Sequence, residues 1–127
     1  DPVHALPASW GVREAIGGVQ TVIGLGSFRD DTVLQADLVL PLATELERFE
    51  AYEPPTSVGV AAFGVSEPVV EPVGDGRHPA DILLAVARAL PEPVAGRFAW
   101  TDYEAFLNQA TVRLAERQDF FRCSSAW

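Results

Sequence analysis

The residues best placed to do chemistry lie in one short stretch between positions 24 and 32. Gly24-Leu-Gly26 ends a run of apolar and β-branched residues, and the polar segment Ser27-Phe-Arg-Asp-Asp-Thr32 follows at once. Where a buried strand leads into a helix, free backbone N–H groups at the helix start can bind a phosphate or the edge of a sugar. The stretch therefore indicates a nucleotide-type ligand.

The glycine pair has a second interpretation. The GxGxxG fingerprint of dinucleotide-binding proteins is absent, because Arg29 stands where the third glycine belongs. Gly24 and Gly26 could instead serve to let the end of a strand pass close beneath a helix. The sequence leaves both interpretations open.

Other chemistry finds little support in the sequence. His4 and His78 have no partner at metal-ligand spacing, and the single cysteine, Cys123, cannot form an internal disulfide or a CxxC zinc site. No serine stands in a GxSxG motif. The acidic pair Asp30-Asp31 is explained more simply by helix capping than by acid–base catalysis. We therefore assign no catalytic residue and no metal ligand.

The composition excludes some partners and favours others. Among 127 residues, 18 are acidic and 9 are basic, all of them arginine, for a net charge of −9. Nucleic-acid binding needs clustered cations, so DNA and RNA are excluded as partners. No apolar run is long enough for a direct membrane span. A hydrophobic share of 48% with only 21% charged residues predicts apolar surface that faces a neighbour.

The sequence begins at Asp1 and contains no methionine. We expect it to be one portion of a longer polypeptide, with the remainder as its first partner. No leader segment is visible in it.

The chemistry-bearing stretch is predicted to lie within a compact βαβ unit of an α/β protein. A strand over 20–26 leads to a helix of about two turns, capped by Asp30 or Asp31 and ending at Ala36, and a second strand covers 37–41. Both strands read as buried on both faces, as in parallel sheets, with a right-handed crossover. A short helix before them has Ser9 as its cap and ends at Gly17-Gly18 through positive φ angles.

The remainder of the chain is predicted to be less regular. Residues 42–49 have helical character, residues 57–73 suggest irregular strands, and 74–76 form a turn. Pro79 should begin a helix over 79–90, with an apolar face made of Ile82, Leu83, Val86 and Leu90.

The last helix should begin with a capping box. Thr101 and Glu104 have the required spacing, and the helix should end near Arg117. Its apolar face is predicted to contain Tyr103, Phe106, Leu107, Ala110 and Leu114. The tail 118–127 shows no period. We divide the chain into a βαβ portion over 1–53, irregular strands and a helix of the same domain over 54–100, and a C-terminal helix and tail over 101–127.

Seven segments of the sequence resemble the molybdopterin oxidoreductase superfamily in their order and spacing. The likeness covers roughly the first hundred residues and is strongest to the large subunits of the polysulfide-reductase-like branch, which includes alternative complex III. Its segments are Asp1-Pro-Val-His-Ala-Leu-Pro7, Arg13-Glu-Ala-Ile16, Ser27-Phe-Arg-Asp-Asp-Thr32, Ala36-Asp-Leu-Val-Leu-Pro41, Leu46-Glu-Arg-Phe49, Glu67-Pro-Val-Val-Glu-Pro72 and Asp81-Ile-Leu-Leu-Ala-Val-Ala-Arg88.

The resemblance implies that the chain is a fragment of a Rossmann-like, parallel-sheet α/β domain that helps to bind molybdopterin guanine dinucleotide. It implies contacts to the cofactor at Asp1, Pro2, Ser27, Asp31 and Thr32. It also implies molybdenum in the complete protein, iron–sulfur and membrane-anchor subunits as partners, and a periplasmic location or membrane association through those partners. The family's metal ligand and cysteine cluster are not among these residues, so this chain alone is not expected to be catalytic or to hold the cofactor by itself.

Two departures from the family pattern keep other readings open. The family commonly has Asn at the position of Asp1, and the Gly-Thr-Tyr-Thr-Asn segment of related branches is absent after Glu47. The first alternative is a cofactor-free scaffold subunit that keeps the fold within a quinone-linked electron-transfer complex. The second alternative is a stand-alone small α/β binding module.

Overall fold

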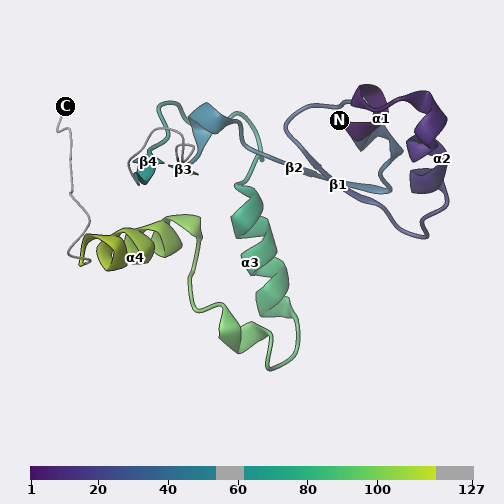
Figure 1. Cartoon of the computed structure of the whole chain (residues 1–127). Coiled ribbons are helices and arrows are strands. Elements are labelled where there is room, and N and C mark those ends of the chain that lie inside the picture. The colour runs from purple at the N-terminus through teal and green to yellow at the C-terminus, as the bar shows by residue number, and fades with distance from the viewer. Residues whose placement is uncertain (54–61, 117–127) are drawn as a thin grey trace. The chain divides into compact units, whose positions relative to one another are not determined.

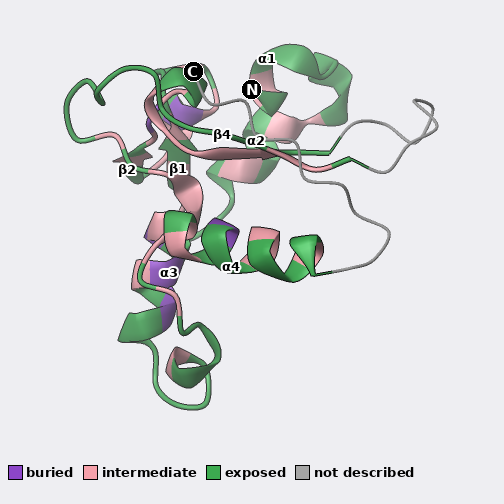
Figure 2. Ribbon diagram, turned by 90° about the vertical axis from the view of Figure 1, so that its left-hand side faces the viewer, coloured by how far each residue is buried: buried purple, intermediate pink, exposed green. Residues whose placement is uncertain are grey.

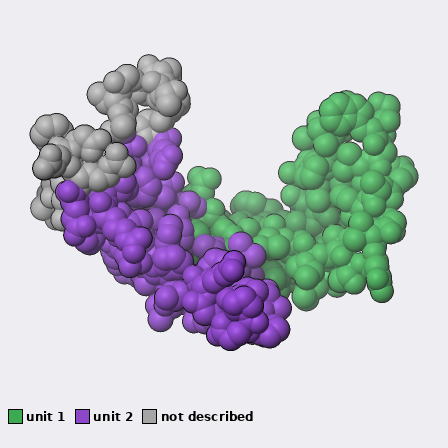
Figure 3. Space-filling model, turned by 60° about the horizontal axis from the view of Figure 1, so that its bottom comes forward, with its two compact units in different colours: residues 1–48, 68–79 green, residues 49–67, 80–127 purple. Residues whose placement is uncertain are grey.

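The computed structural model describes residues 1–53 and 62–116. The tail at 118–127, Cys123 and the predicted helix end at Arg117 lie outside the described residues. The chain forms two compact units, one of residues 1–48 and 68–79 and the other of residues 49–67 and 80–127 (Figure 3). Short helices, a parallel strand pair and an antiparallel strand pair confirm the α/β class (Figure 1).

The first unit opens with two short helices. Helix α1 spans Pro2–Ala5 and is capped by Asp1, whose carboxylate accepts the N–H of His4. Helix α2 spans Val12–Gly17, and its N-cap is Gly11, which has a φ of 65°. The predicted Ser9 cap is wrong, because Ser9 lies in the 3-10 turn η1 (Ala8–Trp10). The predicted positive φ at the end of α2 is wrong too, since Gly18 is right-handed at −85°.

Strands β1 (Ile23–Gly26) and β2 (Leu38–Pro41) form the predicted parallel pair, with Ile23 opposite Leu38. The connection is tighter than predicted, because only the 3-10 helix η2 (Val33–Gln35) forms instead of two helical turns. Asp30, not Asp31, accepts the N–H of Val33, at 2.7 Å.

The glycines of β1 face η2. A Cβ atom on Gly24 would lie 2.9 Å from Cβ of Ala36, and one on Gly26 would lie 2.8 Å from a methyl group of Val33. Side-chain carbon atoms do not approach this closely, so only glycine fits at both positions. Close packing of the connection on the sheet therefore accounts for the glycine pair without a ligand.

The opposite face of this sheet is open. Ile23 and Leu25 point away from η2 together with Leu38 and Leu40, because paired residues of parallel strands share a face. Ile23 is 52% exposed and Leu38 is 51% exposed. The prediction of strands covered on both faces is thus wrong for the described residues, while the predicted apolar surface is present.

The chain returns to this unit after residue 67. Arg77 forms an isolated parallel bridge with Leu42, through hydrogen bonds from Ala43 N–H to Arg77 O and from Arg77 N–H to Pro41 O, both at 3.1 Å. Gly76 permits this approach, since a Cβ there would lie 2.9 Å from the nitrogen of Ala43. The predicted turn forms just before it, with Gly74 at a φ of 76°.

The predicted helix over 42–49 is reduced to the 3-10 helix η3 (Glu45–Glu47), which Glu47 ties to the returning segment. The Glu47 carboxylate accepts the N–H of Thr44 at 2.6 Å and the N–H of Val73 at 2.9 Å. The hydrogen bonds from Thr44 and Val73 lower the pKa of Glu47 below its ordinary value of 4.5. The Glu47 side chain thereby caps η3 and also binds the backbone at Val73, 26 positions later in the sequence.

We expect Glu47→Gln to reduce the stability of this unit at neutral pH and to remove part of its acid sensitivity. Because the pKa of Glu47 is lower in the folded state, its contribution is present above pH 4.5 and is lost as the pH falls through the lowered pKa. Urea unfolding at several pH values measures this, with the neighbouring Glu45→Gln as the control. Equal pH dependence in wild type and Glu47→Gln would contradict the assignment.

The second unit contains an antiparallel strand pair and two longer helices. Strand β3 (Glu50–Tyr52) pairs with β4 (Gly64–Ser66), and helix α3 spans Pro79–Ala89 with Pro79 first, as predicted. The predicted apolar face of α3 is largely wrong: Ile82, Leu84 and Ala87 are buried (Figure 2), while Leu83 and Val86 are exposed. None of the described helices is long and apolar enough to cross a membrane.

Helix α4 spans Tyr103–Ala115 and buries Leu107, which is only 2% exposed. The predicted Thr101–Glu104 capping box is wrong, because Asp102 is the cap and accepts the N–H of Ala105 at 2.8 Å. Asp81 on α3 accepts the N–H of Tyr103 at 2.7 Å, so α3 also helps to fix the start of α4. The two helices are thereby joined within one unit.

Candidate functional site

Four of the five predicted cofactor residues lie together, where α1 meets the connection between β1 and β2. They are Asp1, Pro2, Asp31 and Thr32. The Thr32 hydroxyl donates a hydrogen bond to the Asp1 carboxylate at 2.5 Å and accepts the N–H of Val3 at 3.0 Å. Pro2, the first residue of α1, lies between Asp1 and Val3 in the sequence. These bonds hold residues about thirty positions apart in sequence, so α1 lies against the connection that follows β1.

His4 and Asp31 lie beside these residues. The His4 Nδ1 atom lies 3.8 Å from an oxygen of Asp31, and both side chains are largely exposed. We call Asp1, Val3, His4, Asp31 and Thr32 the N-terminal cluster. Sequence reasoning assigned no role in this cluster to Val3 or His4. The one signal available was the Asp1 cap, which places His4 three residues into α1.

Ser27 does not hydrogen-bond to the N-terminal cluster in the described structure. It follows β1, and its hydroxyl donates to the carbonyl oxygen of Ala43 at 3.5 Å. It marks the carboxyl end of the parallel pair, since Ala43 comes two residues after β2. Ligands of parallel sheets bind at this end of the strands.

The backbone N–H groups around the cluster already have acceptors. Thr32 takes the N–H of Val3, Asp1 takes that of His4 and Asp30 takes that of Val33. The predicted free donors for a phosphate are therefore not found at these three positions. The described residues also contain no group of three or more metal-ligating side chains that could hold a metal ion.

The charges of the cluster decide which part of a nucleotide fits. Asp1 and Asp31 are exposed carboxylates, while the exposed Arg29 of the same connection is a nearby cation in sequence. A carboxylate only accepts hydrogen bonds and repels phosphate, whereas a purine edge or a ribose offers N–H and O–H donors. The cluster therefore suits the base or sugar end of a nucleotide better than its phosphates.

Comparisons with known proteins also bear on which ligand this chain binds. No protein-family model matches the sequence, and no solved structure matches it. The chain is similar to the menaquinone reductase, molybdopterin-binding-like subunit of Nitratidesulfovibrio vulgaris, with 31% identity over 90 residues. The match covers 71% of this chain, which spans 13% of the length of that relative.

Proposed function

We propose that this chain is part of the large subunit of a molybdopterin-dependent oxidoreductase and contributes to the site of molybdopterin guanine dinucleotide. Support comes from the name of the similar protein, a molybdopterin-binding-like subunit of a menaquinone reductase. The observation that carries the proposal is the Asp1–Thr32 hydrogen bond, which brings the predicted residues of two distant segments together. We propose further that the chain belongs to the polysulfide-reductase-like or alternative complex III-like branch.

The residues would hold the nucleotide end of the cofactor. Asp31 would accept the N–H groups of the guanine edge. The Thr32 hydroxyl, which donates to Asp1 and accepts from Val3, would offer its remaining lone pair beside Asp31. Ser27, at the carboxyl end of the strands, would contact another part of the nucleotide. Asp1 and Pro2 would fix α1 so that Thr32 keeps its orientation. When bound, the molybdenum–pterin group supplies oxygen-atom or two-electron transfer, while the protein supplies position and electrostatics.

The rest of the same large subunit would be the first partner. Iron–sulfur and membrane-anchor subunits would complete a respiratory electron-transfer complex, at a periplasmic or membrane-associated location through those partners. The exposed apolar face of β1 and β2 supports a covering neighbour, because parallel sheets are normally buried on both sides.

A second function is favoured by the electrostatics of the N-terminal cluster. Two exposed carboxylates and internally satisfied N–H groups are a poor surface for a pyrophosphate. These features support a cofactor-free scaffold subunit of a quinone-linked complex. The two proposals share the fold and differ in whether a nucleotide binds.

Guanine recognition can be measured directly on the full chain by NMR titration with GMP, IMP and AMP. We expect GMP to shift the amide signals of Asp31 and Thr32 and to bind several-fold more tightly than IMP, which lacks the exocyclic amino group. Asp31→Asn should remove this preference, because its amide cannot accept from both guanine donors. Asp75→Asn, in the exposed turn of the same unit, is the matched control.

The possible results separate the two functions. Saturable binding without a guanine preference contradicts the assignment of Asp31. Absence of binding together with no molybdenum or pterin in the native polypeptide supports the scaffold. Stoichiometric molybdenum and pterin in that polypeptide support the enzyme.

A further inference from the structure

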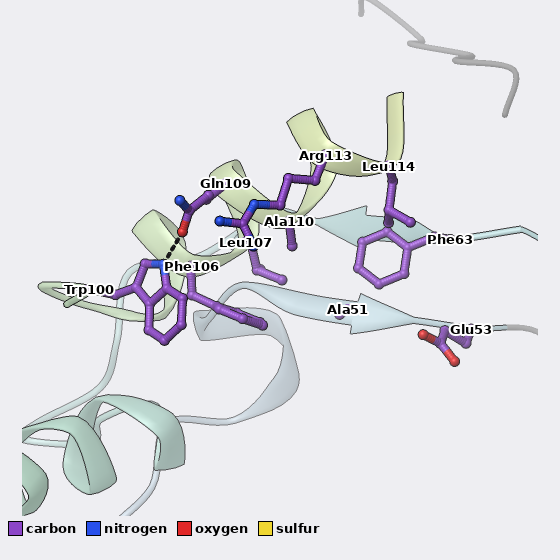
Figure 4. Close-up of a pocket in the computed structure, with 10 residues that line it drawn as sticks. All are labelled: Ala51, Glu53, Phe63, Trp100, Phe106, Leu107, Gln109, Ala110, Arg113 and Leu114. Carbon is purple, nitrogen blue, oxygen red and sulfur yellow. Dashed lines mark hydrogen bonds between the residues drawn. The ribbon is translucent and has the colours of Figure 1, made fainter. Parts of the chain in front are cut away.

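The second unit contains a pocket that the proposed nucleotide site does not use. It has a volume of about 460 Å³ and lies between α4 and the β3–β4 pair (Figure 4). Its walls are mainly apolar, with Phe63, Phe106, Leu107 and Leu114 facing the space. Pockets for small molecules typically measure about 300–1,000 Å³ and have such walls with a few placed polar groups.

An aromatic group closes one end of this pocket. The ring of Trp100 meets the ring of Phe106 edge-on, with centroids 5.1 Å apart and planes at 87°. The indole N–H of Trp100 donates to the side-chain oxygen of Gln109 at 2.6 Å. Because the oxygen of Gln109 is engaged, its NH₂ group stays available as a donor on the side away from the indole.

Arg113 adds a cation beside this donor. It lies one helical turn after Gln109, and its side chain runs back along α4, so that its guanidinium group lies near Gln109 (Figure 4). Arg113 forms no ion pair within residues 1–53 and 62–116. Glu53 stands at the other end of the pocket, beyond Phe63. The donors of Gln109 and Arg113 therefore lie on one side of the pocket, and the Glu53 carboxylate lies at its other end.

We propose that this pocket binds a small monocarboxylate with an apolar body. The carboxylate lies against Arg113 and Gln109, and the body packs on Phe63, Phe106 and Leu114. An arginine pairs with a carboxylate through two parallel hydrogen bonds, which orients the ligand. One arginine balances a single negative charge, so a singly charged anion fits this pocket better than a doubly charged phosphate.

The test is a calorimetric titration of the full chain with 1-naphthoate and with its neutral counterpart 1-naphthalenemethanol. We expect naphthoate to bind with one-to-one stoichiometry and more tightly than the alcohol. Arg113→Met keeps the apolar stem and removes the charge, so the Kd for naphthoate should rise about tenfold or more, as expected for the loss of a charge-assisted hydrogen bond. The Kd for the alcohol should stay unchanged.

Arg97→Met is the matched control, because Arg97 is an exposed arginine of the same unit that does not line the pocket. It should bind naphthoate as the wild type does. Equal affinity for naphthoate and the alcohol, or an unchanged Kd in Arg113→Met with a native circular dichroism spectrum, overturns the proposal. No saturable uptake by the wild type overturns it as well.

Discussion

Replacing Leu107 by alanine is expected to lower the free energy of unfolding of the second unit by about 3 kcal/mol, within the range of about 2–5 kcal/mol for such changes. Leu107 is the largest fully buried side chain among the described residues. Its removal loses the transfer free energy of the side chain and leaves a cavity at the floor of the pocket. Urea unfolding followed by circular dichroism measures the loss.

Leu83→Ala is the matched control for this prediction. Leu83 lies on α3 of the same unit and is 63% exposed, so the same chemical change should cost less than about 1 kcal/mol. Similar losses for the two variants would show that Leu107 does not occupy the core of this unit.

Gly26→Ala is expected to destabilise the first unit by about 1–3 kcal/mol, the usual cost of overpacking. The added methyl group would lie 2.8 Å from Val33 and 3.2 Å from the carbonyl oxygen of Phe28. Val33 is buried and belongs to the short η2, so neither the side chain nor the backbone can move away easily. Thermal unfolding followed by circular dichroism gives the size of the effect.

A second substitution tests the stated cause. Val33→Ala removes the methyl group nearest to position 26, so the double variant should lose less stability than the sum of the two single losses. Strictly additive losses would mean that the contact with Val33 is not what requires glycine at position 26.

The parallel strand pair could be predicted from the sequence because its apolar, β-branched runs are short and are separated by polar residues. The starts of helices were predicted less well. Asp102 replaced the predicted Thr101 because its carboxylate reaches the N–H of Ala105. The face of α3 was misjudged because the helix has apolar residues nearly all round, so periodicity alone does not select Leu84 over Leu83.

The candidate site likewise has a part that local sequence predicts and a part that it does not. The stretch from Ser27 to Thr32 could be predicted as a place for polar chemistry, since it follows a strand. Its contact with Asp1 joins residues 31 positions apart, a distance that local patterns do not report. The cofactor roles of Asp1, Pro2, Ser27, Asp31 and Thr32 stay predictions. The pocket beside α4 depends on how Phe63 and Trp100 lie against the helix. No sequence motif predicts that arrangement.

The division of the chain into two units has a consequence for dissecting it. The backbone passes from one unit to the other at residues 48–49, at 67–68 and at 79–80. A fragment that ends at residue 48 would lack Arg77 opposite Leu42 and the Val73 N–H on Glu47. A fragment that begins at residue 80 would lack β3 and β4. No single cut therefore yields two whole units, and their boundaries must be studied by deletion and rejoining rather than by truncation.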